Sequence, residues 1–109
     1  MAMVIKRFDV YLVNLDPVIG SEIQKTRPCV VISPDEMNRS IASVIIAPMT
    51  TQSKDWPTRF VCHFDGKSGQ VALDQIKTID NIRMTKYLGR LNAKEQKAVL
   101  RTVIEMFAE

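Results

Sequence analysis

Histidine and cysteine are scarce in this chain of 109 residues, which contains one histidine and two cysteines. Cys29 and Cys62 form no CxxC pair, and together with the histidine they lack the spacing of a metal-binding set. The carboxylates form no dense cluster either. We therefore predict no metal site, no cofactor and no disulfide framework. Both cysteines are expected to be free, buried thiols in a reducing compartment.

Long hydrophobic runs are also missing. The apolar stretches are too short to cross a bilayer, and no continuous apolar segment follows the charged residues near the N-terminus. We therefore expect a cytoplasmic protein with no membrane partner. Charge of one sign is not in large excess, because 15 Lys and Arg residues against 12 Asp and Glu residues give a net charge of +3. That balance permits a polyanionic partner without requiring one.

The residues that are present predict a small β protein. A hydrophobic content of 46% over this length is ordinary for one globular domain, which we expect to span residues 1–109. Short β-branched and aromatic runs predict strands at 9–15, 28–32, 43–49, 59–64, 70–73, 74–79 and 88–91, with a turn or one helical turn at 35–40. Asp65-Gly66 and Ser68-Gly69 are turn signals and predict a hairpin.

The C-terminal segment predicts an α-helix. Asn92 is a good N-cap, and Glu95 three residues later can complete a capping box. One apolar stripe follows at helical spacing, formed by Leu100, Val103, Ile104 and Phe107. Because such a stripe packs on a sheet, the expected fold class is mainly β with a C-terminal helix, in the form of a small curled barrel.

Two polar segments lie at the ends of predicted strands. Arg27-Pro28 leads from a polar loop into one strand, and Thr50-Thr51-Gln52 follows another. If these strands are neighbours, Arg27 and Thr50 converge on one small anionic group. A guanidinium presents a planar set of donors suited to phosphate, and threonine adds a hydroxyl. This pattern points to phosphodiester chemistry.

Three blocks of the sequence resemble the MazF/PemK/Kid-type toxins, in the order and spacing of that family. They are Leu15-Asp16-Pro17-Val18-Ile19-Gly20-Ser21-Glu22 with Thr26-Arg27-Pro28, then Pro48-Met49-Thr50-Thr51-Gln52-Ser53-Lys54, and then Asp74-Gln75-Ile76-Lys77-Thr78-Ile79-Asp80. The resemblance runs from about Arg7 to the final helix. It implies an SH3-like small barrel, a homodimer, metal-independent endoribonuclease activity on single-stranded RNA, and a cognate antitoxin that blocks the RNA groove.

Two departures bring the resemblance closest to the MazF branch. The Kid-like branch has a histidine in the Gly-x-Glu loop and an arginine shortly before Asp-Gln, where this chain has Ser21 and Ala72. In the MazF branch the arginine of Arg-Pro and the threonine after the third strand carry the chemistry. The resemblance therefore implies Arg27 and Thr50 as catalytic residues.

Cleavage of RNA without a metal uses the 2′-hydroxyl of the RNA, which attacks the adjacent phosphate and leaves a 2′,3′-cyclic phosphate and a 5′-hydroxyl. The protein must align this attack, stabilise charge on the phosphorane oxygens and help the 5′-oxygen to leave. Arg27 suits charge stabilisation, and Thr50 can donate a hydrogen bond to a non-bridging oxygen. As proton acceptor, Glu22 is the carboxylate nearest to Arg27 in the sequence, and Asp74 is the second candidate.

Further residues of these three blocks and of the loops beside them are candidates for RNA contact: Ser21, Lys25, Thr51, Gln52, Lys54, Trp56, Asp74, Gln75 and Lys77. Three of them have a structural alternative. Thr51 can be a strand former, Trp56 can pack against the barrel rim, and Lys77 can be an outward-facing strand residue. His63 alternates with apolar neighbours and lies outside the blocks, so we do not place it in the site.

Two rival functions of other classes stay open. One is a gyrase-poisoning toxin of the same fold, which would not need the pair of Arg27 and Thr50. The other is a catalytically silent SH3-like RNA-binding module. In either case, the apolar run 44–46 and the helix stripe offer more apolar surface than one small barrel readily covers, which favours a homodimer.

Overall fold

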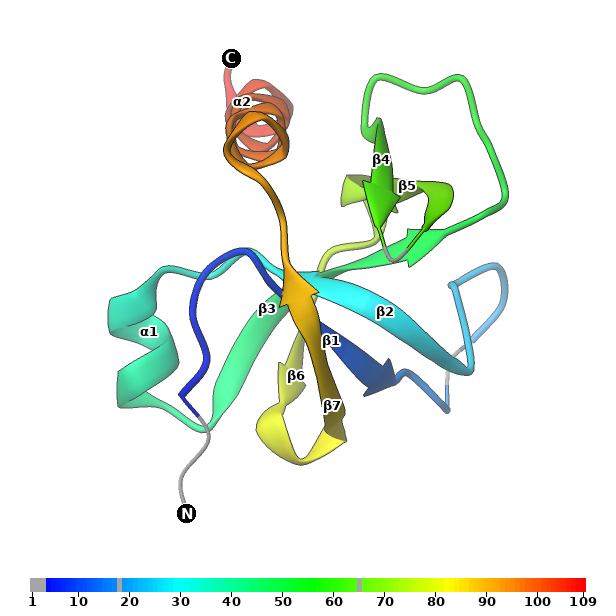
Figure 1. The fold of residues 1–109 in the computed structure, drawn as a ribbon. Helices are drawn as coiled ribbons and strands as arrows, with labels where there is room; N and C mark the ends of the chain where they lie inside the picture. The colour runs from blue at the N-terminus through cyan, green and yellow to red at the C-terminus, as the bar shows by residue number, and fades with distance from the viewer. Residues whose placement is uncertain (1–3, 18, 65) are drawn as a thin grey trace.

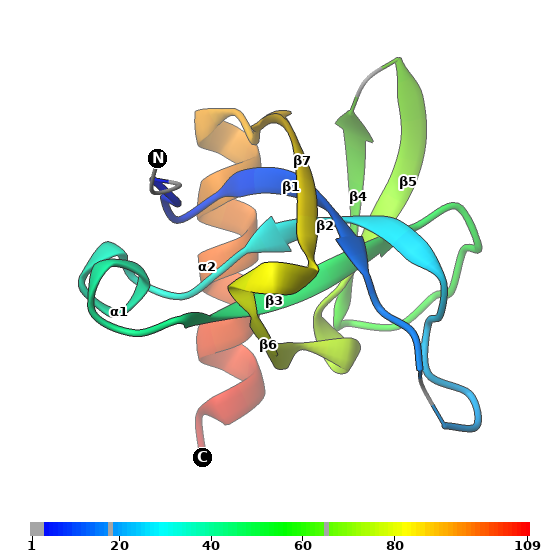
Figure 2. The ribbon, with the colours of Figure 1, turned by 90° about the horizontal axis from the view of Figure 1, so that it is seen from below.

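The computed structural model describes residues 4–17, 19–64 and 66–109. Its elements are β1 (Asp9–Asn14), β2 (Thr26–Val31), α1 (Asp35–Ser40), β3 (Ser43–Thr50), β4 (Arg59–Phe64), β5 (Lys67–Ala72), the 3₁₀ turn η1 (Leu73–Gln75), β6 (Lys77–Asp80), the 3₁₀ turn η2 (Asn81–Arg83), β7 (Met84–Arg90) and α2 (Ala93–Phe107). A curved sheet extends from α1 at one end to the β4–β5 hairpin at the other, and α2 covers one side (Figures 1 and 2).

The sheet curls around β3, its longest strand. The strand order is β4-β5-β3-β2-β1-β7, and β6 also pairs with β3. One edge of β3 pairs with β2, while the other edge pairs first with β6 and then, at its end, with β5. Because two strands share that edge, the sheet turns away from a plane and forms a curled half-barrel. The predicted class, mainly β with a C-terminal helix, is confirmed.

Apolar side chains are buried on both sides of the central strands. Val30 and Ala47 belong to a cluster against which α2 packs, whereas Cys29 and Ile46 belong to a second cluster. Strands covered on both faces are apolar nearly throughout, which explains the composition of β3. Val44 and Ile46 are 0% exposed within this single chain, so the run 44–46 cannot supply the dimer seam expected from the sequence.

The start of α2 agrees with the sequence. The Asn92 side chain accepts a hydrogen bond from the Glu95 amide at 2.8 Å, and the Glu95 carboxylate accepts one from the Asn92 amide at 3.1 Å. These two contacts complete the predicted capping box.

The buried face of α2 differs from the predicted stripe. It is formed by Val99, Leu100, Val103 and Met106. Ile104 and Phe107 are 68% and 71% exposed, so their assignment to the packing face is wrong. The helix contacts β4 and η1, and Val99 is fully buried. Ile104 and Phe107 each follow a partly buried residue by one position, so they point away from the sheet.

Three predicted strand boundaries are also wrong. β5 begins at Lys67, so Ser68 and Gly69 lie inside the strand and pair with β4 instead of forming a turn; Asp65 lies outside the described residues. Residues 73–75 form η1 rather than extended chain, and β7 covers 84–90 rather than 88–91. The β7 boundary is set by pairing with β1, which is distant in the sequence, and local composition does not encode that pairing.

Candidate functional site

Arg27 lies near the start of β2, and Thr50 is the last residue of the neighbouring strand β3. The register pairs Cys29 with Pro48 and Val30 with Ala47, and its continuation sets Arg27 across from Thr50. Both residues line a cavity of about 210 Å³. Its other lining residues are Pro28, Met49, Thr51, Cys62, Phe64, Lys67, Ser68, Gly69 and Leu88. The convergence predicted from the sequence is therefore present.

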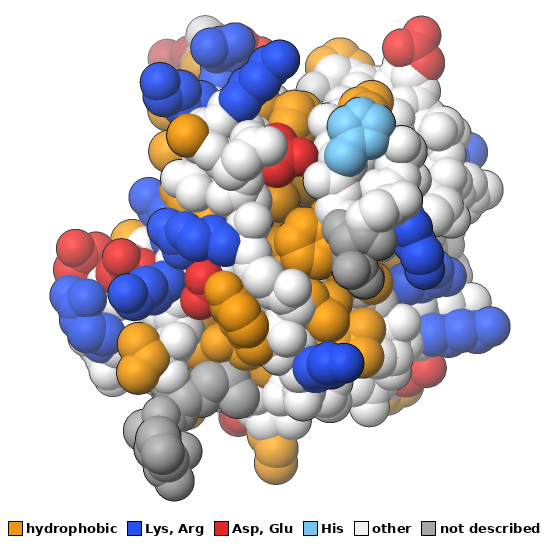
Figure 3. All heavy atoms as spheres, in the orientation of Figure 1, with side chains coloured by type: hydrophobic (Ala, Val, Ile, Leu, Met, Phe, Trp, Pro, Cys, Tyr) orange, Lys and Arg blue, Asp and Glu red, His pale blue; other side chains and the backbone are white. Residues whose placement is uncertain are grey.

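The lining of this cavity suits a phosphate group. It combines two basic side chains and three hydroxyl groups with an apolar floor, and it contains no carboxylate. Figure 3 shows hydrophobic side chains at the surface between α2 and the β4–β5 hairpin, with Lys and Arg side chains along the margin beneath the hairpin. Donors in such a partly apolar setting interact more strongly with an anion than they would in open water.

The Thr50 hydroxyl is oriented by its neighbours. Its oxygen accepts a hydrogen bond from the Gln52 amide at 3.1 Å, which leaves the hydroxyl proton free to be donated. On the adjacent strand, a Cβ atom at Gly69 would lie 2.8 Å from the Thr50 carbonyl oxygen. Only glycine permits this close approach of β5, so Gly69 helps to place Thr50.

Arg27 is available for a ligand. Its Nε donates to the carbonyl of Gln24 at 3.2 Å, and the ion pairs of the described residues do not include Arg27. In particular, Arg27 and the nearby Glu22 form no ion pair within the described part of the chain. Glu22 lies with one carboxylate oxygen 4.0 Å from the Lys77 ammonium, and its other oxygen accepts from the Ile19 amide at 3.1 Å.

A second cavity adjoins the first, and a third adjoins the second. The second, of about 280 Å³, shares Thr50 with the first and is also lined by Ser21, Ile23, Gln52, Lys54, Trp56, Arg59 and Gln75. The third, of about 430 Å³, is lined by Leu15, Ser21, Glu22, Ile23, Pro48, Trp56, Asp74, Gln75, Ile76 and Lys77. All candidate residues from the sequence except Lys25 line one of the three cavities. Lys25 instead shapes its loop, where its amide donates to Asp16 at 2.8 Å.

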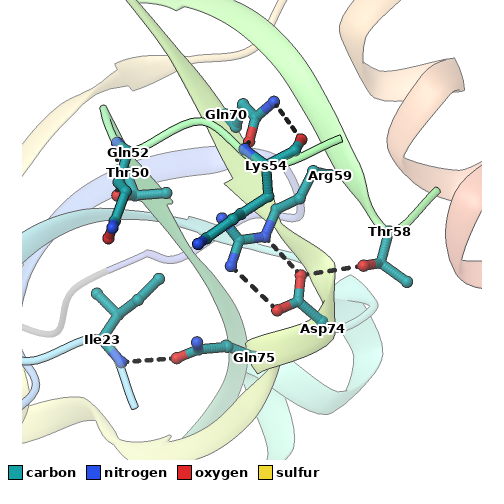
Figure 4. A network of polar contacts seen from close by, with 9 residues as sticks. All are labelled: Ile23, Thr50, Gln52, Lys54, Thr58, Arg59, Gln70, Asp74 and Gln75. Atoms are coloured by element: carbon teal, nitrogen blue, oxygen red, sulfur yellow. Dashed lines mark hydrogen bonds and ion pairs between the residues drawn. The ribbon is translucent and has the colours of Figure 1, made fainter. Parts of the chain in front are cut away.

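Arg59 is a site residue that sequence reasoning missed. Its Nε and Nη2 donate to the two oxygens of Asp74 at 2.7 and 3.2 Å, and the Thr58 hydroxyl donates to Asp74 at 3.1 Å (Figure 4). The signal available in the sequence was an arginine opening a strand directly after the Trp56 loop. Asp74, fifteen residues away, is brought to it by the β4–β5 hairpin.

This pairing makes Asp74 a poor proton acceptor. Burial alone would raise the pKa of Asp74, but hydrogen bonds from Arg59, its own backbone amide and Thr58, together with the positive charge of Arg59, outweigh it. The pKa of Asp74 is therefore lowered from its usual value. A carboxylate held in this way accepts a proton less readily than an unpaired one.

Gln75 holds the β1–β2 loop. Its side-chain oxygen accepts a hydrogen bond from the Ile23 amide at 2.6 Å, which ties the loop to η1 (Figure 4). The NH₂ group of Gln75 makes no hydrogen bond to the described residues in this arrangement and can donate to a base edge, and the oxygen has a second lone pair that can also accept.

Cys62 and His63 provide no nucleophile or base to the cavities. Burial, followed by the charge of Glu95, raises the pKa of Cys62 to about 11, and burial raises that of Cys29 to about 12, so both remain thiols near neutral pH. Both are free and buried, as predicted. His63 is exposed on β4, with its Nδ1 2.8 Å from the Ser68 hydroxyl, and does not line the three cavities.

Within residues 4–17, 19–64 and 66–109, His, Cys, Asp and Glu side chains do not gather in groups of three or more that could hold a metal ion. The helices of this described part are too short or too polar to cross a membrane.

Fold and site together define a small, curled β protein whose basic, hydroxyl-lined cavity suits a phosphate group. The family profile described as PemK-like, MazF-like toxin of type II toxin-antitoxin system matches residues 6–107. The chain belongs to this family.

Individual relatives agree with this membership. The chain is 35% identical over 96 residues to endoribonuclease EndoA of Bacillus subtilis, covering 83% of each protein. Its fold is similar to the crystal structure of MazF from Deinococcus radiodurans, with a TM-score of 0.84 and 23% identity over 96% of this chain and 97% of that one. It is also similar to a mycobacterial endoribonuclease in complex with its cognate antitoxin, with a TM-score of 0.78 and 22% identity over 92% and 91% of the chains.

Proposed function

We propose that this protein is the toxin of a type II toxin–antitoxin pair and a sequence-specific endoribonuclease acting on single-stranded RNA. The observation that carries the proposal is that Arg27 and Thr50, from the neighbouring strands β2 and β3, line one cavity whose lining contains no carboxylate. The EndoA relative is named an endoribonuclease, and the family is one of toxins. We also propose that the protein acts in the cytoplasm, where its messenger RNA substrate would be found.

The proposed reaction is transesterification by the RNA itself. The 2′-hydroxyl attacks the adjacent phosphorus, the bond to the 5′-oxygen breaks, and the products are a 2′,3′-cyclic phosphate and a 5′-hydroxyl. Arg27 stabilises negative charge on the non-bridging oxygens, and Thr50 donates its free hydroxyl proton as a hydrogen bond to the same group. Preorganised donors stabilise the transition state because they do not need to reorient during the reaction.

Glu22 is the better proton acceptor of the two carboxylates. Asp74 is engaged by Arg59, whereas the Glu22 side chain is 51% exposed and its nearest cation, Lys77, is 4.0 Å away. Glu22 lines a different cavity from Arg27, but the two cavities are joined through the one that contains Ser21 and Thr50. Movement of the β1–β2 loop on binding RNA would bring Glu22 to the 2′-hydroxyl.

Replacing Glu22 with Gln tests this role. We expect kcat to fall by about 10²–10⁴, the usual contribution of a general base, while RNA affinity changes little. Wild-type kcat in Glu22→Gln would remove Glu22 from the proton transfer.

The rival functions are not favoured. Gyrase poisoning does not need Arg27 and Thr50 to converge, and a silent RNA-binding module would not need a free hydroxyl aimed at the same cavity as a guanidinium. A cleavage assay with purified protein, a labelled messenger RNA and excess chelator separates all three. Cleavage supports the proposal, and binding without cleavage supports the silent module. The absence of both binding and cleavage favours gyrase poisoning.

Thr50→Val tests the hydroxyl directly. The substitution keeps the β-branched shape but removes the donor to the phosphate, so kcat is expected to fall by about 10²–10³. Thr50→Ser is the matched control, because it keeps the hydroxyl that also accepts from the Gln52 amide. Single-turnover cleavage and thermal unfolding should be measured for both. Equal activity of Val and Ser variants would mean that Thr50 is only a strand former.

The remaining cavity residues form the proposed RNA path. Lys54 and Lys77 supply charge for the phosphates on either side of the cleavage site, and Ser21, Thr51 and Gln52 supply donors. We further propose that the protein is a homodimer, for which the exposed Ile104 and Phe107 on α2 are available apolar side chains.

RNA and antitoxin are expected to compete for this path. Neutralising about three phosphates gives a slope of about −2 for log affinity against log salt concentration on a single strand. An antitoxin with an acidic, partly disordered tail should displace the RNA completely. Fluorescence polarisation with labelled RNA and light scattering check these points. Simultaneous binding of RNA and antitoxin at full affinity, or a monomer at micromolar concentration, would contradict this assembly.

A further inference from the structure

The loop between β3 and β4 carries Trp56, the only tryptophan of the chain. Trp56 lines the same cavity as Thr50 and is 48% exposed. A large aromatic side chain in a polar, exposed loop is ordinarily mobile. Here the loop is fastened at two places by side chains from β5 and η1, which makes the ring part of a fixed surface.

Gln70 provides the first fastening. Its side-chain oxygen accepts from the Lys54 amide at 3.0 Å, and its side-chain NH₂ donates to the Lys54 carbonyl at 3.0 Å (Figure 4). One amide side chain thus satisfies both backbone groups of Lys54, as a neighbouring strand would. Gln70 is only 8% exposed, and its backbone pairs with Thr50. Gln70 therefore fixes the position of the loop relative to the end of β3, which carries the proposed catalytic hydroxyl of Thr50.

Asp74 provides the second fastening, through Arg59. The Arg59 guanidinium carbon lies 4.8 Å from the centre of the Trp56 ring, and the Arg59 amide donates to the Trp56 carbonyl at 3.0 Å. The two hydrogen bonds to Asp74 fix this guanidinium, whose side chain is only 5% exposed. A cation that an ion pair holds against an aromatic ring restrains the ring itself.

Lys54 is a second cation beside the same ring. Its ammonium lies 5.6 Å from the ring centre, and the ion pairs of the described residues do not include it. The backbone of Lys54 is held by Gln70, but its ammonium can leave the ring for an RNA phosphate. Trp56 would then present more of its surface to a base while Lys54 binds the neighbouring phosphate.

We propose that Trp56 is a fixed stacking platform for one unpaired base of the RNA, and that Gln70 and Asp74 are the positioning residues that hold it beside Thr50. The proposal rests on the proposed function, because it requires single-stranded RNA in the cavities. Bases stack on aromatic rings largely irrespective of identity, and a ring that is already ordered loses little entropy on binding. The platform therefore sets which nucleotide of the RNA strand lies beside Thr50.

The first test needs no RNA. Because Trp56 is the single tryptophan, the anisotropy decay of its fluorescence in the free protein reports on this ring alone. We expect Gln70→Met and Asp74→Asn each to add a fast local motion of the indole. The matched control is Asn38→Ala, which removes a buried amide that hydrogen-bonds Ser33 near α1, at the other end of the molecule (Figure 1). It should lower the unfolding temperature without changing the decay.

The second test uses RNA. Cleavage sites of the wild-type protein are first mapped on a long messenger RNA. A fluorescein-labelled oligonucleotide spanning the strongest site is then made with deoxyribose at the cleaved nucleotide, so that it binds without being cut. Versions with one abasic nucleotide at each position are compared by polarisation. One position is expected to weaken wild-type binding by about tenfold to a hundredfold, the usual range for one stacked base, and to have no effect on Trp56→Leu.

The results separate the platform from the proposed function. With Gln70→Met, KM should rise by about tenfold to a hundredfold, as for loss of the stacked base, while kcat stays near the wild-type value. If the Met variant does not fold, Gln70→Glu gives the same comparison. If RNA binds without quenching the fluorescence of Trp56, the stacking platform is wrong, although the proposed nuclease activity still stands. The same conclusion follows if the abasic effect persists in Trp56→Leu. Failure of the wild-type protein to bind or cut any RNA overturns both.

Discussion

Replacing the 2′-hydroxyl by hydrogen at the single nucleotide before the cleavage site is expected to stop cleavage altogether. The hydroxyl is the nucleophile of the proposed reaction, so its removal deletes a reactant rather than weakening a contact. Binding should be nearly unchanged, because the deoxy substitution leaves the phosphates and bases in place.

The measurement is single-turnover cleavage of matched ribose and deoxy oligonucleotides, with binding followed by polarisation. Excess EDTA in both reactions should leave the ribose substrate fully cleavable, since none of the proposed steps uses a metal. A deoxy substitution one nucleotide further along serves as the control and should be cut normally. Cleavage of the deoxy-substituted site at the normal rate would show that water or a protein side chain is the nucleophile.

Arg27→Ala is expected to reduce kcat by about 10²–10³ while leaving the fold intact. The guanidinium acts on charge that develops on the phosphate, and among the described residues it donates only to the exposed Gln24 carbonyl. Stability should therefore change by less than about 0.5 kcal/mol, as is usual for surface positions without buried contacts.

Two comparisons sharpen the Arg27 test. Arg27→Lys keeps the charge but loses the planar set of donors, so its rate should lie between those of the wild-type protein and Arg27→Ala. Arg101→Ala removes an exposed arginine on α2, outside the three cavities, and should leave kcat unchanged. A folded Arg27→Ala protein with normal kcat would exclude Arg27 from the reaction.

Features set by neighbouring residues were predictable from the sequence. The capping box of Asn92 and Glu95 depends on four consecutive residues, and the alternation that buries Cys62 and exposes His63 depends on the two-residue period of a strand. The convergence of Arg27 with Thr50 was also predictable, because each residue marks a strand end and only the pairing of two strands had to be assumed.

Features set by register and docking could not be predicted in this way. Nothing local to Arg59 specifies that it meets Asp74, and nothing local to Gln70 specifies that its amide satisfies the backbone of Lys54. Both contacts arise because the β4–β5 hairpin folds back on the end of β3, which is a matter of long-range pairing.

The sequence by itself determined the family, the fold class, the two residues proposed to act on the phosphate, and the burial of both cysteines. These follow from short motifs and periodic patterns, in which each residue is read against its chain neighbours. Tertiary structure alone decided which face of α2 is buried, that Asp74 is paired rather than free, and that the Trp56 loop is held in place. Those outcomes depend on which side chains, distant in the sequence, come into contact, and only the packed fold brings them together.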